Sequence, residues 1–256
     1  MDVLTSTDPQ LADRLDRERA YHDQRFAEET RLAQRKYYWA VRDAFSAYEQ
    51  RRTQLAQGGD VLEYGCAKGA VSLSLAPTAK SVTGIDISPV AIGSANDAAA
   101  AQGLLNTRFD VMNAEAMEFE DESFDFIFGS GIIHHLDVKR SYRELHRVLR
   151  PGGRVLFIEP LGHNPVLGLY RKMTPAARTE DEHPLRKGDI RAFGEIFGDL
   201  RTHHFGLFSL GAVPFRNTAA GPAAYGASRA LDRAVFALPF AKWWSWFCVM
   251  EGRKAD

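Results

Sequence analysis

Short apolar segments alternate with helical segments between residues 60 and 160, and this alternation limits the possible folds more than any other feature of the chain. The apolar segments are DVLEYG, SVTGIDIS, TRFDVM, FDFIFGSG and GRVLFIEP. The segments with helical character between them are 69–76, 89–102 and 137–149. Buried strands joined by helices at this spacing form right-handed βαβ units. We therefore predict an α/β protein built on a mostly parallel sheet.

The segment before this region is predicted to be helical. Residues 9–52 have a helical pattern throughout, because Pro9 can open a helix and no glycine or proline interrupts the pattern before Gly58. We therefore expect an N-terminal helical cover, residues 1–58, followed by one sheet domain, residues 59–256.

The last third of the chain has a weaker pattern. Glycine, proline and polar residues predict irregular insertions on the substrate side of the domain, at about 160–190 and 209–240. Between and around them we expect a helix at 188–198, a strand near 200–208, a loose segment at 211–226 and a short helix at 228–237.

Charge and cysteine content exclude several classes of protein. The formal net charge is −1, which provides no overall field for attracting nucleic acid. Cys66 and Cys248 are the only cysteines, and this usage fits a reducing cytosol. No apolar run approaches the roughly 20 residues of a membrane span, and the first residues do not resemble a signal peptide. We expect a cytoplasmic protein that has no membrane span and no nucleic-acid partner.

A bend rich in small residues follows the first predicted strand. Gly65, Ala67 and Gly69 come directly after Glu63, at the point where the strand gives way to a helix. Small residues at such a bend let a ligand approach the backbone N–H groups closely. A dinucleotide-binding loop has a similar pattern, and so does a purely structural turn.

The ends of the next two strands favour a nucleoside ligand. Asp86 ends the second strand roughly 20 residues after the bend, where a carboxylate holds the hydroxyl groups of a ribose. After the third strand, the side-chain amide of Asn113 and the backbone N–H of Ala114 can pair with an adenine edge. The bend lacks the further glycine spacing and the Lys-Ser/Thr pair that would hold a pyrophosphate.

In order and spacing, these motifs resemble the class I S-adenosylmethionine-dependent methyltransferases, in the branch that includes ubiquinone and menaquinone methyltransferases. The resemblance covers residues 60–160. It implies a seven-stranded Rossmann-like sheet with helices on both faces and an antiparallel last strand, which WWSWFCVMEGRK would supply between two neighbouring strands. It also implies that the cofactor is S-adenosyl-L-methionine and the product S-adenosyl-L-homocysteine.

The resemblance assigns roles to residues in the four motifs. By this assignment the methionine end lies on the first bend, the ribose and adenine on the next two strand ends, and the fourth strand passes beside the cofactor. The residues implied are Glu63, Gly65, Cys66, Gly69, Asp86, Ile87, Asn113, Ala114 and Gly129. Two positions depart from the pattern, since the family often has glycine in place of Ala67 and usually aspartate in place of Asn113.

Methyl transfer from a sulfonium is an in-line displacement, so alignment and exclusion of water are the protein's main tasks. A hydroxyl or acidic C–H acceptor also needs a base. Ligands bind outside the carboxyl ends of parallel strands, and the candidate bases after the fourth and fifth strands and beyond are His134, Glu159, His163, Glu182 and His183. Packing, capping and turn formation are the alternative roles of these residues. We expect no metal, because no helical His-x-x-x-His pair or close chelating spacing is present.

Four functions remain open at this point. We expect a methyltransferase that acts on a small-molecule metabolite, most readily at oxygen with a His or Glu base, or alternatively at nitrogen or carbon. A methyltransferase of RNA or protein is disfavoured by the neutral charge and by GSGI where an Asn-Pro-Pro-aromatic motif would stand. The other two are a non-methylating enzyme of the same fold, such as a cyclase, and a dinucleotide oxidoreductase.

The C-terminal aromatic residues have two interpretations. Trp243, Trp244, Trp246 and Phe247 are either part of a buried strand, which we expect, or an anchor on a membrane surface. The apolar content of residues 205–247 fits a hydrophobic acceptor and core packing equally well.

Overall fold

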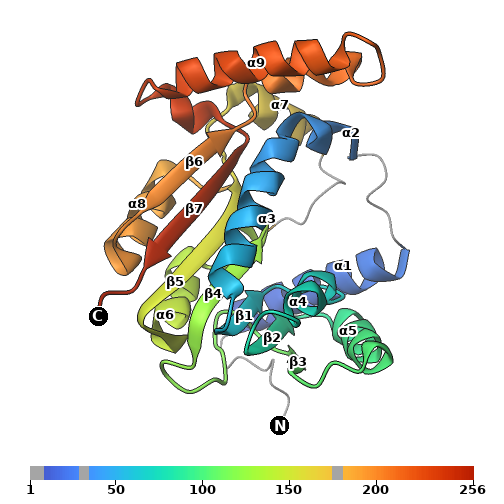
Figure 1. Cartoon of the computed structure of the whole chain (residues 1–256), viewed down its shortest axis with the longest axis vertical. Coiled ribbons are helices and arrows are strands. Elements are labelled where there is room, and N and C mark those ends of the chain that lie inside the picture. Colours follow the sequence, from blue (N-terminus) through green and yellow to red (C-terminus); the bar gives the residue numbers. More distant parts are fainter. Residues whose placement is uncertain (1–8, 29–34, 175–180) are drawn as a thin grey trace.

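A seven-stranded sheet forms the centre of the molecule (Figure 1). The computed structural model describes residues 9–28, 35–174 and 181–256. The strand order is β3-β2-β1-β4-β5-β7-β6, and β7 runs antiparallel to both of its neighbours while the other pairs are parallel. The strands are β1 (Asp60–Tyr64), β2 (Ser81–Asp86), β3 (Thr107–Val111), β4 (Phe124–Ser130), β5 (Leu149–Pro160), β6 (Arg201–Phe205) and β7 (Phe247–Arg253). The predicted fold class and the inserted last strand are confirmed, but the strand begins only at Phe247, and Trp243 and Trp244 of the predicted segment lie in a 3₁₀ turn instead.

The register brings the carboxyl ends of the parallel strands to one edge. Tyr64 pairs with Ile85 and Asp86 pairs with Val111, so β1, β2 and β3 end side by side. Ser130 at the end of β4 pairs with Ile158 of β5. The loops that follow these strands therefore meet along a single rim, as the switch-point rule requires of a ligand site.

Helices cover both faces of the sheet. The α-helices are α1 (Pro9–Glu28), α2 (Arg35–Tyr38), α3 (Arg42–Ala56), α4 (Ala70–Leu75), α5 (Pro89–Gln102), α6 (Val138–Val148), α7 (Pro165–Met173), α8 (Lys187–Phe197) and α9 (Gly221–Phe236). The 3₁₀ segments are η2 (Trp39–Val41), η3 (Ile133–His135), η5 (Ser209–Phe215) and η6 (Ala241–Trp244). No helix among the described residues is both long and apolar enough to span a bilayer.

Alternation along β4 separates two apolar cores. Ile127 belongs to the core that includes Tyr142 of α6 and Phe193 of α8, whereas Phe128 belongs to the core that includes Tyr48 of α3. Successive side chains of a strand point to opposite faces, so β4 is buried on both. This is why the strand reads as a continuous apolar run rather than as an alternating one.

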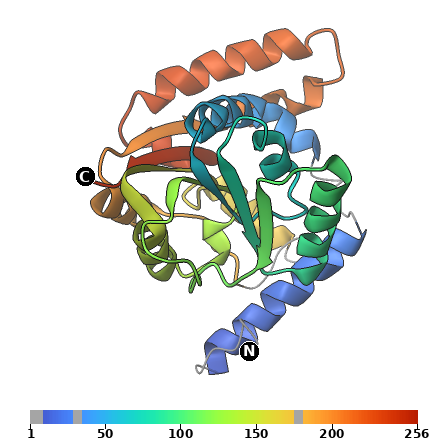
Figure 2. The ribbon, with the colours of Figure 1, turned by 60° about the horizontal axis from the view of Figure 1, so that its bottom comes forward.

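The prediction of one helix over residues 9–52 was wrong in its continuity. α1 ends at Glu28, residues 29–34 lie outside the described residues, and α2, η2 and α3 follow. Val41, at the N-cap of α3, has a non-helical backbone and is buried in the core beneath that helix. α3 packs on β5 and β7, whereas α1 packs beside α5 (Figure 2). One straight helix could not make both contacts.

Two segments predicted to be irregular form helices instead. α7 begins after Asn164, whose side chain accepts the backbone N–H groups of Val166 and Leu167, and Pro165 occupies its first turn. Residues 211–226 were expected to be loose, yet η5 ends at Phe215 and α9 starts at Gly221. In this second segment tertiary contacts override weak local signals. The buried carboxylate of Asp232 in α9 accepts N–H groups at the start of η5.

Candidate active site

A cavity of about 160 Å³ lies at the rim where β1, β2, β3 and β4 end. α1 crosses this rim and contributes one wall. The lining residues are Arg14, Leu15, Glu18 and His22 of α1, Gly65 and Ala67 of the bend, Ile85, Asp86 and Ile87, Met112, Asn113, Ala114 and Glu115, and Ser130, Gly131, Ile132, His135 and Leu136. Five of the predicted cofactor residues are therefore brought together at the cavity, namely Gly65, Asp86, Ile87, Asn113 and Ala114.

The bend after β1 needs small residues because space beside Ile132 is limited and because the backbone has positive φ angles. Gly65 has a φ of +79°, and a Cβ built on it would lie 3.0 Å from the Ile132 side chain. Ala67 also has a positive φ, 49°, which alanine adopts at an energetic cost that glycine would not have. The backbone N–H groups of Gly65 and Cys66 donate to the Ile85 carbonyl, which fixes the bend to the end of β2.

Asp86 joins the bend to the second strand end. Its carboxylate accepts the backbone N–H of Ala67 at 2.9 Å and that of Ser88 at 3.0 Å. Burial raises the pKa of Asp86, while these two N–H donors and the nearby His22 oppose the rise. A ribose diol would add two further donors to this carboxylate and would favour its charged form.

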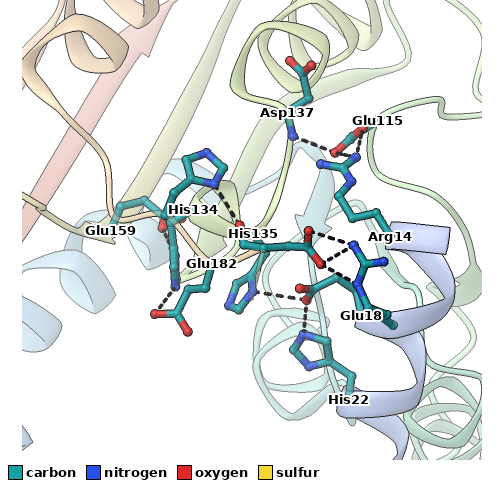
Figure 3. A network of polar contacts seen from close by, with 12 residues as sticks. Arg14, Glu18, His22, Glu115, His134, His135, Asp137, Glu159 and Glu182 are labelled. Atoms are coloured by element: carbon teal, nitrogen blue, oxygen red, sulfur yellow. Dashed lines mark hydrogen bonds and ion pairs between the residues drawn. The ribbon is translucent and has the colours of Figure 1, made fainter. Parts of the chain in front are cut away.

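The loop after β3 is tied to α1. The Glu115 carboxylate binds the Arg14 guanidinium at 2.5 Å and accepts the backbone N–H of Asp137 at 2.7 Å (Figure 3). Asn113 uses its side-chain oxygen to accept the N–H of Glu115 at 2.9 Å. An amide oxygen has two lone pairs, so one remains for an adenine amino group.

Glu63 lies beneath the cavity and is not among its lining residues. Its carboxylate accepts the backbone N–H of Ser72 at 2.9 Å and the Ser72 hydroxyl at 2.6 Å. Burial raises the pKa of Glu63 to about 7. Glu63 therefore ties the end of β1 to α4, and its direct contact with the methionine end stays a prediction.

The remaining cofactor predictions, Cys66, Gly69 and Gly129, shape the walls instead of lining the cavity. A Cβ on Gly69 would lie 2.8 Å from the Ala95 Cβ, so glycine allows α4 and α5 to approach. A Cβ on Gly129 would lie 2.7 Å from the Phe157 ring. The backbone carbonyl of Gly129 accepts a hydrogen bond from the Tyr48 hydroxyl. The Cys66 side chain is buried in the core beneath the bend.

Of the predicted bases, His134 and Glu159 form a buried pair next to the cavity (Figure 3). Glu159 Oε2 lies 2.7 Å from His134 Nδ1, and Oε1 accepts the backbone N–H groups of Ile132 and Ile133 at 2.9 Å each. Because an ionised carboxylate can only accept, Nδ1 carries a proton. Burial lowers the pKa of His134, so the ring is neutral at pH 7 and Nε2 has a free lone pair.

The other three predicted bases lie further out. Glu182 is 3.8 Å from His134 Nε2 and forms an ion pair with Arg171 at 2.8 Å. His183 donates its backbone N–H to the His134 carbonyl, and His163 Nε2 accepts the N–H of Lys187 at the start of α8. None of the three is among the cavity-lining residues, and their catalytic roles stay predictions.

Sequence reasoning missed the groups that α1 brings to the cavity. Glu18 Oε2 lies 3.2 Å from His135 Nδ1 and 3.5 Å from His22 Nε2 (Figure 3). Glu18 and His22 are four residues apart in a helix, which places both on one face. This spacing is the sequence signal from which their proximity could have been predicted. The position of His135 opposite them follows only from the tertiary structure.

These side chains also bear on the expectation that no metal binds. Glu18, His22 and His135 each offer a ligand atom within 4.8 Å of the others, and so do His134, His135 and Glu182. Two imidazoles and a carboxylate are a donor set that suits divalent transition metals. Each set combines two ligands that are near in sequence with a third from a distant segment, so only the tertiary structure brings the three together.

Comparison with known proteins shows the family of the central region. Residues 62–157 match the family model described as a methyltransferase domain. Curated relatives include the uncharacterized methyltransferase YcgJ of Bacillus subtilis, 34% identical over 54% of each chain. The ubiquinone/menaquinone biosynthesis C-methyltransferase UbiE of Geotalea daltonii is 35% identical over 43% of this chain and 48% of its own. The 2-heptyl-1-hydroxyquinolin-4(1H)-one methyltransferase of Mycobacteroides abscessus is 33% identical over 52% of this chain and 56% of its own.

The chain thus spans about half the length of the curated relatives it matches. Among solved structures, that of YcgJ from B. subtilis has a TM-score of 0.58 at 20% identity and covers 82% of this chain and 99% of that chain. The [4+2]-cyclase SpnF has a TM-score of 0.56 at 20% identity, over 83% of this chain and 81% of its own. At this identity the likeness concerns the fold alone. The central region is a methyltransferase domain with the class I fold, and the predicted family and its cofactor, S-adenosylmethionine, are confirmed.

Proposed function

We propose that this chain transfers the methyl group of S-adenosylmethionine to an oxygen atom of a small molecule and releases S-adenosylhomocysteine. The observation that carries the proposal is that one cavity is lined both by the predicted nucleoside contacts and by an imidazole. Asp86, Asn113 and Ala114 line it on the strand side, and His135 lines it at the β4 loop. A donor bound there would lie beside a group that can take a proton.

The cofactor halves follow the strand ends. Asp86 would accept the ribose hydroxyls, Asn113 and Ala114 would hold the adenine edge, and the bend at Gly65 would receive the methionine end. S-adenosylmethionine supplies an activated methyl on a sulfonium, so the chain needs to align the acceptor and exclude water. α1 covers the rim and provides that exclusion.

We assign the base to His135 and its orientation to Glu18. The Glu18 carboxylate lies 3.2 Å from His135 Nδ1, and its negative charge would favour a proton on that nitrogen. The Nε2 lone pair would then be left to accept the proton of an acceptor hydroxyl. The neighbouring His134, whose ring centroid lies 4.3 Å away, is held neutral by burial. His134 and Glu159 then keep the loop that carries His135 in position, so the proposed base is a residue that the predicted set of His and Glu bases did not include.

Support for a small acceptor comes from composition and from the names of relatives. The net charge of −1 offers no field for a polyanionic substrate. Two relatives are named for quinone and hydroxyquinolinone substrates, and the second name includes a hydroxyl group. The UbiE relative is named a C-methyltransferase. A C-methylated product would therefore change the proposed acceptor atom from oxygen to carbon.

The test has two stages. Calorimetry should detect binding of S-adenosylhomocysteine to the purified chain. Labelled S-adenosylmethionine and a panel of hydroxylated aromatic compounds should then yield an O-methyl product by mass spectrometry and NMR. His135→Gln and Glu18→Gln should lower kcat by roughly 100-fold, a typical general-base effect, with S-adenosylhomocysteine affinity within about threefold of wild type.

The matched control is His203→Gln, a change at an exposed histidine of β6 that should leave both values unaltered. Absence of any S-adenosylhomocysteine binding would overturn the function as a whole. Full turnover in His135→Gln would overturn only the base, and an N- or C-methyl product would overturn only the acceptor atom.

A further inference from the structure

We infer that one end of the molecule is a docking face for an anionic phospholipid bilayer. The docking face consists of α7 and of residues 208–244, which comprise η5, α9 and η6. Figure 1 shows α7 and α9 together at the same end of the molecule. Docking does not depend on the proposed methyl transfer, because it rests on exposed surface outside the cavity.

The first observation is an apolar stripe on α7 that faces solvent. Val166, Leu169, Tyr170 and Met173 follow the i, i+3, i+4, i+7 spacing of a helix face, with exposed fractions of 73%, 60%, 40% and 73%. A stripe with this spacing normally packs into a core. No residue of α7 is buried, so the helix presents outward the face that a globular protein would cover.

The second observation is that the neighbouring segments expose large apolar side chains on the same end. In residues 208–244 these are Phe208, Phe215, Leu231, Leu238, Phe240 and Trp244. The side chain of Asn164, which caps α7, donates to the Trp244 carbonyl at 2.8 Å, so η6 and the start of α7 are joined. η5 and η6 each contact α9. These segments therefore expose large apolar side chains at the same end of the molecule as the α7 stripe, and clustered exposed apolar residues mark an interaction surface.

The third observation is the sign of the charge around this region. α7 carries Arg171 and Lys172 and has no acidic residue, and residues 205–247 contain Arg216, Arg229, Arg233 and Lys242 with Asp232 as the single acid. Arg171 and Arg229 form ion pairs with Glu182 and Asp43, which lie outside the docking face, so its positive charge rests on the other four basic residues. Asp232 is 4% exposed, and its carboxylate points inward to the N–H groups of residues 207–209. The docking face is therefore apolar and positive although the whole chain has a net charge of −1.

Apolar residues combined with basic ones are the signature of a helix that lies in the plane of an anionic membrane surface. Tyr170 and Trp244 are of the aromatic types that favour this interface. A second copy of the chain fits less well, because two such faces would bring like charges together. Of the two interpretations of the C-terminal aromatic residues, the buried strand applies to Phe247, which lies in the core. The membrane-surface interpretation fits Trp244, which is exposed on the docking face.

The docking face adjoins the rim of the candidate active site. α7 begins shortly after the carboxyl end of β5, and Arg171 of α7 holds Glu182, which lies 3.8 Å from His134. These contacts connect the docking face to the loop that carries His134 and His135, although no residue of α7 is among those that line the cavity.

The test is co-sedimentation of the full chain with large unilamellar vesicles. We expect binding to vesicles of equimolar phosphatidylglycerol and phosphatidylcholine at least about tenfold tighter than binding to pure phosphatidylcholine, and weaker at high salt because screening reduces the charge attraction. Val166→Asp combined with Met173→Asp should weaken binding to the anionic vesicles by roughly tenfold or more. The double change replaces two apolar contacts with two negative charges, which the anionic lipids repel. Leu105→Asp is the matched control, since Leu105 is 98% exposed and lies outside the docking face.

Thermal unfolding should show that both variants fold, because all three positions are exposed. No sedimentation with either vesicle overturns the proposal, and so does equal loss in the Leu105→Asp control. A dimer seen by light scattering that the double variant abolishes, without vesicle binding, would assign the docking face to a second copy instead. Calorimetry with S-adenosylhomocysteine on the same preparations reports the cofactor site separately.

Discussion

The Glu159 carboxylate orients the His134 imidazole, with Oε2 2.7 Å from Nδ1 at a position where Glu159 is fully buried. The other oxygen of Glu159 holds the backbone of the loop after β4. One buried group from β5 therefore sets both the tautomer of His134 and the path of the chain that carries His135 to the cavity.

This pair predicts a tautomer that NMR can detect. In wild type, ¹⁵N shifts should show His134 protonated at Nδ1. Glu159→Gln can place an amide donor opposite Nδ1, which should move the proton to Nε2 and destabilise the fold by about 1–3 kcal/mol. Glu182→Gln changes a group near Nε2 only, so its His134 should keep the wild-type tautomer. An unchanged tautomer in Glu159→Gln would contradict the orientation described here.

Asp86 should matter more for the cofactor than other exposed or half-exposed acids. Asp86→Ala removes a charged acceptor from the ribose position, and we expect S-adenosylhomocysteine to bind about 10- to 100-fold more weakly by calorimetry. Asp97→Ala, at an exposed position of α5, should bind as wild type does. Equal affinity in Asp86→Ala and wild type would remove the ribose assignment.

Glu63 should make the stability of the protein depend on pH. Its pKa rises from the ordinary value of 4.5 to about 7 on folding, because burial disfavours the charged form. A raised pKa means that the folded state binds the proton more tightly, so stability is highest below pH 4.5 and decreases as the pH rises through 7. The decrease should amount to roughly 3 kcal/mol at full effect. Urea unfolding from pH 4.5 to 8 should show it.

Glu63→Gln should flatten this pH dependence, because a neutral amide does not titrate. Glu195→Gln, at an exposed position of α8, is the matched control and should retain the wild-type slope. A slope in Glu63→Gln equal to that of the control would show that another group titrates.

Two glycine-to-alanine changes should have opposite signs. Gly69 has a φ of +73°, and an added Cβ would lie 2.8 Å from both Ala95 and Phe109. Gly69→Ala should therefore lower the free energy of unfolding by roughly 2–4 kcal/mol. Gly93 lies within α5 with nothing within 4 Å of an added Cβ, so Gly93→Ala should raise it by about 0.5–1 kcal/mol. Urea denaturation of both variants checks the two signs, and a neutral Gly69→Ala would contradict the close approach of Gly69 to Ala95 and Phe109.

The strand ends of the candidate site could be predicted because each depends on local sequence. Gly65 and Asp86 stand where an apolar run stops, and parallel strands end at one edge, so their proximity follows from the fold class alone. The helix boundaries at 89–102 were also readable, since Ser88 caps the start of α5 and Gly103 ends it. α7 was missed and α9 was predicted only in its second part, at 228–237. Both begin in segments where proline and glycine hide the helical period.

The sequence alone therefore determined the sheet, its order at the predicted cofactor edge and the residues that stand at the strand ends along that edge. These features depend on burial patterns and turn chemistry, which are properties of short segments. Only the tertiary structure decided which imidazole reaches the cavity, because His134 and His135 are adjacent and the turn of η3 directs one to Glu159 and the other to Glu18. It also decided that α1 covers the rim and that the apolar stripe of α7 faces outward. Both depend on how distant segments pack, and no local pattern contains that information.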